Sequence, residues 1–92
     1  MAKKTADLNL KFKKIYAKAM VEKPELPIRS IVGHEFVLST IEKDIKGDNT
    51  YLARLLTTDN IKIPGRGTDK ITAIIATFNH LEDMGFTLNY GQ

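Results

Sequence analysis

The strongest pattern in this sequence is an apolar stripe with helical spacing near its C-terminal end. The stripe consists of large side chains that recur on one helix face: Ile71, Ile74, Ile75, Phe78, Leu81 and Met84. Thr68 is a suitable N-cap, and Asp69 favours the first helical turn. Gly85 suits a Schellman stop, in which Phe86 folds back on the last turn. The sequence therefore predicts a helix over residues 69–84.

Three further helices are predicted upstream of that one. Residues 6–23 have their own apolar stripe, formed by Leu8, Phe12, Ile15, Ala19 and Met20. Residues 27–46 form the second predicted helix after a proline break, and Gly33 within it marks a kink or a break. Residues 50–58 form a short third helix. Its apolar residues, which we expect to pack against the stripe of the last helix, are Leu52, Leu55 and Leu56.

Two short segments alternate between apolar and polar residues, as strands do. They cover residues 61–63 and residues 86–90, and we expect them to pair with each other across the last helix. Residues 64–67, which are Pro-Gly-Arg-Gly, are predicted to be a loop. The predicted fold is therefore mainly α, with four helices and a short two-stranded β element in one domain over residues 1–92.

Composition places the chain in a reducing compartment. It has 92 residues and no cysteine, which excludes disulfides, thiolate metal ligands and cysteine catalysis. Small secreted domains usually carry disulfides, so we expect a cytoplasmic protein. No apolar run approaches the roughly 18–20 residues that span a bilayer, and no signal-peptide core follows the first lysines. The prediction is a soluble protein without a membrane partner.

No set of side chains in the sequence indicates catalysis or metal binding. His34 and His80 lie in different predicted helices and have no further ligand at metal spacing. The acidic residues Glu42, Asp44, Glu82 and Asp83 sit at helix spacings that do not converge on one cleft. Ser30 and Ser39 lack the context of a nucleophile elbow. We therefore predict that the protein is not an enzyme and has no metal or cofactor.

Positive charge is concentrated at the N-terminal end. Residues 1–23 contain seven lysines and two acidic residues, residues 24–67 are balanced, and residues 68–92 have a net charge of −2. Three of the lysines, Lys11, Lys14 and Lys18, share one stripe of the first predicted helix. A field polarised in this way can attract a polyanion to one end of a molecule.

The segment from Lys62 to Lys70 is a second candidate anion site. Its two glycines let the backbone approach a ligand closely, and Lys62, Arg66 and Lys70 supply positive charge next to a helix N-terminus. Phosphate is the ligand that this chemistry favours. The alternative is an ordinary loop before a capped helix. If the first interpretation holds, Arg66→Gln should weaken anion binding and leave stability nearly unchanged.

Part of the chain resembles a known DNA-binding region. The similarity lies in Leu52-Ala53-Arg54-Leu55-Leu56, in the segment from Ile61 to Gly67, and in the helix that follows Asp69. Over residues 52–80 this pattern is similar to the helix-turn-helix region of large serine recombinases and related phage or plasmid proteins. The resemblance implies DNA binding through the loop and the start of the final helix.

These observations support two functional hypotheses. The first is a non-enzymatic nucleic-acid-binding accessory or regulatory protein, of phage or mobile-element type, that holds phosphates with Lys11, Lys14, Lys18, Lys62, Arg66 and Lys70. The second is a protein-interaction module, such as an adaptor, inhibitor or immunity-type protein, that docks on a larger partner. A homodimer is also compatible with the sequence. The first hypothesis requires the six cations to share a surface, whereas an exposed apolar patch would favour the second.

Overall fold

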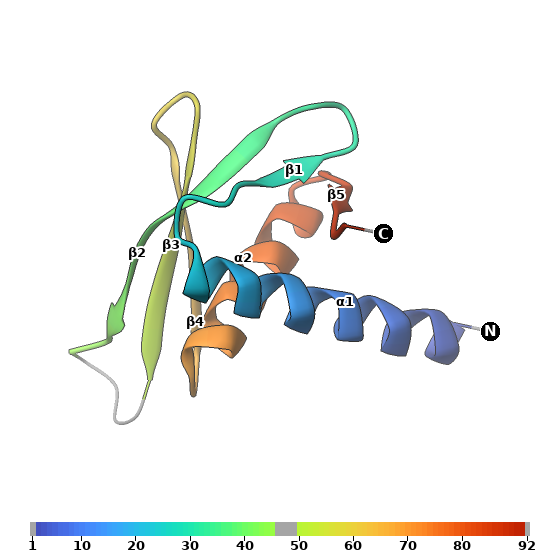
Figure 1. The fold of residues 1–92 in the computed structure, drawn as a ribbon, viewed down its shortest axis with the longest axis horizontal. Coiled ribbons are helices and arrows are strands. Elements are labelled where there is room, and N and C mark those ends of the chain that lie inside the picture. The colour runs from blue at the N-terminus through green and yellow to red at the C-terminus, as the bar shows by residue number, and fades with distance from the viewer. Residues whose placement is uncertain (1, 46–49, 92) are drawn as a thin grey trace.

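The computed structural model describes residues 2–45 and 50–91, with side chains from residue 9 onward. Its elements follow the chain in this order: α1 (Ala2–Glu22), β1 (Ile28–Ser30), β2 (Glu35–Lys43), β3 (Tyr51–Thr57), β4 (Lys62–Gly67), α2 (Lys70–Asp83) and β5 (Leu88–Asn89). The strands form one antiparallel sheet in the order β4-β3-β2-β1-β5. Helix α2 packs against β3 and β4, and α1 packs against α2 (Figure 1). The fold is therefore α/β.

The expectation of a four-helix, mainly α domain is wrong for residues 27–58. Residues 27–46 contain β1, a tight turn and β2, and residues 50–58 contain β3. Many of these residues are β-branched, which favours a pleated strand over a helix. A β-bulge between Leu38 and Thr40 also disturbs the alternation of β2. Consequently Phe36, Leu38 and Ile41 all pack toward the core at a spacing that is irregular for a strand.

The β1–β2 and β3–β4 hairpins close with the same three-residue loop. In the first, the Ser30 amide donates to the carbonyl of His34 (2.8 Å), and in the second the Thr57 amide donates to that of Ile61 (2.9 Å). The third loop residue has a positive φ in each case, 103° at Gly33 and 64° at Asn60. Gly33 therefore closes a hairpin and does not kink a helix, because glycine adopts this conformation without steric cost.

The last helix is confirmed at both ends, with one correction. Asp69 is its N-cap and accepts a hydrogen bond from the Thr72 amide (2.8 Å), so the expected cap Thr68 lies one residue too early. At the other end the Phe86 amide donates to the Leu81 carbonyl (3.1 Å) and the Gly85 amide to the Glu82 carbonyl (3.0 Å). These two bonds are those of the expected Schellman stop. The fully buried large residues of the stripe are Ile74, Phe78 and Leu81.

The expected pairing between residues 61–63 and residues 86–90 is wrong, although both segments contain strands. Strand β4 pairs with β3 at one edge of the sheet, while β5 pairs with β1 at the other edge. Helix α2 has 14 residues and is about 21 Å long, which is close to the roughly 19 Å between five adjacent strands. The helix thus carries the chain from one edge to the other.

Helix α1 forms as expected, and its buried face keeps Phe12 and Met20 of the expected stripe but not Ile15. Ala17 and Met20 are fully buried, Phe12 and Tyr16 pack against the core, and Ile15 of the expected stripe is 57% exposed. The ring of Tyr16 meets that of Phe78 edge-on, with 6.5 Å between the ring centroids. This orientation determines which lysines of α1 face away from the protein.

Candidate nucleic-acid interface

Three of the six predicted cations lie together on the outward face of α1. Lys11, Lys14 and Lys18 are exposed and lie opposite the buried residues Ala17 and Met20. They span about 10 Å along the helix axis. None of the three forms an ion pair with any side chain of residues 9–45 or 50–91. Their charges are therefore available to an external anion.

The fourth cation, Lys70, lies on the same side of the molecule. It is exposed at the start of α2, and with Lys14 it lines an open hollow of about 460 Å³ between the two helices. Asp69 lines the same hollow. Its backbone hydrogen bond with Thr72 holds the pKa of the Asp69 carboxyl below its ordinary value, so the group is ionised at neutral pH. This carboxylate, and not an external anion, occupies the N-terminus of α2.

The remaining two cations, Lys62 and Arg66, lie on the opposite face of the sheet. Side chains of β4 alternate, so Ile63 and Gly65 face α2 while Lys62, Pro64 and Arg66 face outward. We call this side the outer sheet face; it also carries Arg54 and Glu42 on β3 and β2. Because α2 separates this face from α1, no single flat surface contains all six cations.

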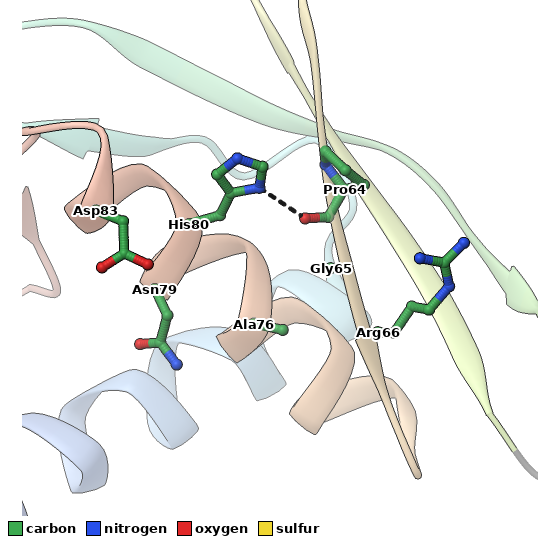
Figure 2. Close-up of a pocket in the computed structure, with 7 residues that line it drawn as sticks. All are labelled: Pro64, Gly65, Arg66, Ala76, Asn79, His80 and Asp83. Atoms are coloured by element: carbon green, nitrogen blue, oxygen red, sulfur yellow. Dashed lines mark hydrogen bonds between the residues drawn. The ribbon is translucent and has the colours of Figure 1, made fainter.

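Arg66 is held by a carboxylate on the outer sheet face. Its Nε donates to Oδ2 of Asp44 at 2.8 Å, and the neighbouring Arg54 lies 3.7 Å from Glu42. Figure 2 shows the Arg66 guanidinium directed away from α2. Arg54 and Arg66 therefore have carboxylate partners, unlike Lys11, Lys14 and Lys18 of α1.

The glycines around Arg66 allow close packing and do not form a ligand loop. Residues 64–67, expected to be a loop, belong to strand β4. A Cβ at Gly65 would lie 2.5 Å from the Thr77 nitrogen and 2.6 Å from the Ala73 oxygen, and a Cβ at Gly67 would meet the same helix. These distances are too short for any side chain, so the glycines let the backbone of α2 approach β4.

Beside β4 lies a polar hollow of about 330 Å³, drawn in Figure 2. Its lining includes Asn79, His80 and Asp83 from α2, and Nδ1 of His80 lies 3.2 Å from the Pro64 carbonyl oxygen. Within residues 2–45 and 50–91, no group of three His, Asp or Glu side chains could hold a metal ion. No buried side-chain nitrogen or oxygen of the described residues lacks a hydrogen-bond partner. We therefore assign no chemistry to this hollow.

A polar network that sequence reasoning missed fixes α1 against α2. Nζ of Lys13 lies 2.7 Å from a carboxylate oxygen of Glu82 and 2.8 Å from the amide oxygen of Asn79. The hydroxyl of Tyr90 donates to the other Glu82 oxygen (2.6 Å), and burial raises the pKa of this phenol. Lys13 lies three residues before Tyr16 and seven before Met20, so helix spacing places it on the same face as these core residues and indicates that it faces the protein.

Comparison of the chain with protein-family models, curated proteins and solved structures finds no match. The helix-turn-helix implied by the resemblance over residues 52–80 is not formed, because β3 and β4 stand where its first helix and turn would be. In the part of the chain that the structure describes, no helix is both long and apolar enough to cross a membrane.

Proposed function

We propose that the protein is a small, non-enzymatic nucleic-acid-binding protein of the cytoplasm that contacts the phosphate backbone through one surface of its helical layer. We call this the α1 lysine surface, and it consists of Lys11, Lys14, Lys18 and Lys70. The observation that carries the proposal is that these four exposed cations lie on one side and have no ion-pair partner among the described side chains. Such cations release condensed counterions when they meet phosphates.

Binding through this surface would not depend on base sequence. The outward face of α1 carries Lys11, Lys14, Ile15, Lys18 and Glu22. None of these is an arginine, asparagine or glutamine, the side chains that read base edges bidentately. Lysine contacts with phosphates position a protein on a duplex without selecting a sequence. An accessory role with broad binding follows from this chemistry.

The salt dependence of binding provides the main test. Fluorescence anisotropy with a labelled duplex should give a slope of log K against log salt of about −3 to −4, corresponding to four phosphate contacts. The combined variant Lys11→Gln, Lys14→Gln and Lys18→Gln should reduce this slope to about −1. An unchanged slope in that variant would remove α1 from the interface.

A matched pair of variants locates the interface. Lys18→Glu and Lys62→Glu change the net charge equally, and both lysines are exposed. We expect Lys18→Glu to weaken binding strongly and Lys62→Glu to have a small effect, because Lys62 lies on the outer sheet face. Equal effects would mean that total charge, and not this surface, drives binding. Binding to vesicles with anionic lipid, but not to the labelled duplex, would contradict the nucleic-acid proposal.

A further inference from the structure

The loops of the β1–β2 and β3–β4 hairpins lie at the same end of the sheet, because the turns between successive antiparallel strands alternate between its two ends. Together with the C-terminal end of α2 they enclose a hollow of about 150 Å³, which we call the hairpin pocket. Its floor consists of core side chains from three elements, Phe36, Ile63 and Leu81, with Phe86 beside them. Ile61 and Met84 line it as well, and they are 54% and 52% exposed.

Exposed apolar side chains of the described residues gather at this end of the molecule. Besides Ile61 and Met84, the tip of the first hairpin presents Ile31 and Val32, which are 68% and 75% exposed. Single exposed apolar residues are ordinary, whereas a group around an apolar hollow is typical of an interaction site. This end therefore has a surface that a partner could cover.

The size of the hairpin pocket limits what can enter it. An apolar cavity of about 150 Å³ takes up a benzene molecule, so the pocket is large enough for one phenyl or branched aliphatic side chain. Its floor is too apolar to hold ordered water well. One bulky apolar side chain is therefore the ligand that the cavity suits.

The charge around the hairpin pocket favours a basic partner. Asp59 and Glu35 both line it. Oε2 of Glu35 accepts a hydrogen bond from Nε of Arg29 (2.6 Å). Asp59, in contrast, has no ion pair among the side chains that the structure describes. The uncompensated charge at the rim is thus negative, and a lysine or arginine next to the inserted side chain would meet it.

The loops that form the rim are held rigidly. The hydroxyl of Ser30 accepts from the His34 amide (3.0 Å), and that of Thr57 accepts from the amides of Asp59 (3.2 Å) and Ile61 (3.0 Å). Each hydroxyl thus braces the loop that follows it. A pocket with preformed walls loses less conformational entropy when a ligand enters.

We propose that the hairpin pocket binds a partner protein through a segment that presents one Phe or Leu side chain directly beside a lysine or arginine. This site is separate from the α1 lysine surface, because Lys70 and Met84 lie at opposite ends of α2, about 20 Å apart along the helix. The partner's apolar side chain fills the pocket between Ile61 and Met84, and its cation pairs with Asp59.

The test uses a capped pentapeptide, Gly-Lys-Phe-Lys-Gly, titrated to millimolar concentration into ¹⁵N-labelled protein and followed by NMR. We expect saturable shifts of the amides of residues 58–61 and 84–86. Two control peptides carry alanine in place of phenylalanine, or glutamate in place of both lysines. Each should bind at least about tenfold more weakly. No shift at these amides, or equal shifts with the alanine peptide, would overturn the proposal.

Two protein variants form a matched control. Ile61→Asp should abolish the shifts caused by the peptide, whereas Ile45→Asp should leave them unchanged, because Ile45 is fully exposed beyond the far end of β2. Asp59→Lys should remove the preference for the basic peptide. Duplex binding should be unaltered in all three, so failure here is distinguishable from failure of the proposed function.

A second copy of this chain is the competing occupant, since Leu10 is 43% exposed and directly precedes Lys11. In that case the amides of residues 58–61 would shift with protein concentration alone, and sedimentation would show a dimer that Ile61→Asp dissociates. That result would replace the partner proposal with self-association.

Discussion

The outward face of α1 and the outer sheet face carry similar numbers of cations but differ in what surrounds them. On α1 the lysines Lys11, Lys14 and Lys18 follow one another at helical spacing, and among the side chains that the structure describes on that face the one acid is Glu22. On the sheet, Arg66 of β4 pairs with Asp44, which directly follows β2, and Arg54 of β3 lies near Glu42 of β2. A cation on a strand therefore lies next to side chains from the neighbouring strands, and their carboxylates can neutralise its charge. A cation on an exposed helix face has only residues of its own helix beside it. The difference shows that the neighbours of a cation, more than its presence, decide whether it can bind an anion.

The largest expected effect concerns the strand that carries Arg66. Gly65→Ala should destabilise the protein by about 3 kcal/mol, since a Cβ there collides with the backbone of α2 at Ala73 and Thr77. Thermal and urea unfolding measure the loss. If Gly65→Ala retained full stability but lost duplex binding, Gly65 would belong to the nucleic-acid site, which we have placed on the α1 lysine surface alone.

Two adjacent lysines of α1 allow a sharper comparison. Lys13→Met should cost about 1–2 kcal/mol of stability, because it removes charged hydrogen bonds to Glu82 and Asn79. Lys14→Met should leave stability almost unchanged and weaken duplex binding by roughly tenfold at ~0.1 M salt. Unfolding and anisotropy on both variants give the result. Equal behaviour of the two variants would show that α1 is oriented differently.

A smaller effect is expected at Arg66. Arg66→Gln breaks an exposed ion pair with Asp44, so stability should fall by less than about 1 kcal/mol. Duplex binding should stay within about twofold of the unaltered protein, because the side chain is already paired and lies on the other face. The sequence alone predicts that Arg66→Gln weakens anion binding. That loss would be observed only if Arg66 breaks its ion pair with Asp44 and contacts a phosphate instead. A melt and a titration on the same sample distinguish these outcomes.

The smallest expected effect is a pH dependence that arises from Asp69. The pKa of this carboxyl is lower in the folded protein than its ordinary value of 3.8, so its contribution to stability is present above that value. It is lost as the pH falls through the folded pKa. Between pH 6 and pH 2, the melting temperature of Asp69→Asn should therefore decrease less steeply with falling pH than that of the unaltered protein. At neutral pH the same variant should bind a duplex slightly more tightly, because Lys70 loses a negative neighbour.

Prediction from the sequence succeeded where the signals were local. The stop of α2 depends on Gly85 and on hydrogen bonds to residues three and five positions earlier, whereas the predicted N-cap, Thr68, lies one residue before the actual cap, Asp69. Both hairpin loops also had local signals, namely a hydroxyl residue followed three positions later by glycine or asparagine. These signals at Ser30–Gly33 and Thr57–Asn60 were outweighed by apolar spacings that suited a helix. The β-bulge in β2 contributed to that error, since it removes the simple alternation of a strand.

The candidate site was predictable only in part. Lys11, Lys14 and Lys18 share a face because helix geometry places residues three, four and seven apart together, whatever surrounds them. Whether Lys70 or Arg66 joins them depends on how α2 crosses the sheet. Arg66 and Lys70 are four residues apart in the chain, yet they face opposite sides of the sheet and helix layers. No pattern within residues 62–70 shows this, because the sequence predicts a loop at residues 64–67, where the structure has the end of strand β4.

The sequence by itself determined that the first and last of the predicted helices form, how the last one ends, and that positive charge is concentrated near the N-terminal end. Each of these depends on interactions within about one helical turn or on composition alone. Only the tertiary structure decided that residues 28–30, 35–43 and 51–57 are strands and that β4 and β5 lie at opposite edges of the sheet. It also decided that Lys13 is held by Glu82 while Lys14 has no ion pair among the described side chains. The physical reason is that strand pairing and helix packing join residues far apart in the chain, and their free energy belongs to the assembled core rather than to any one segment.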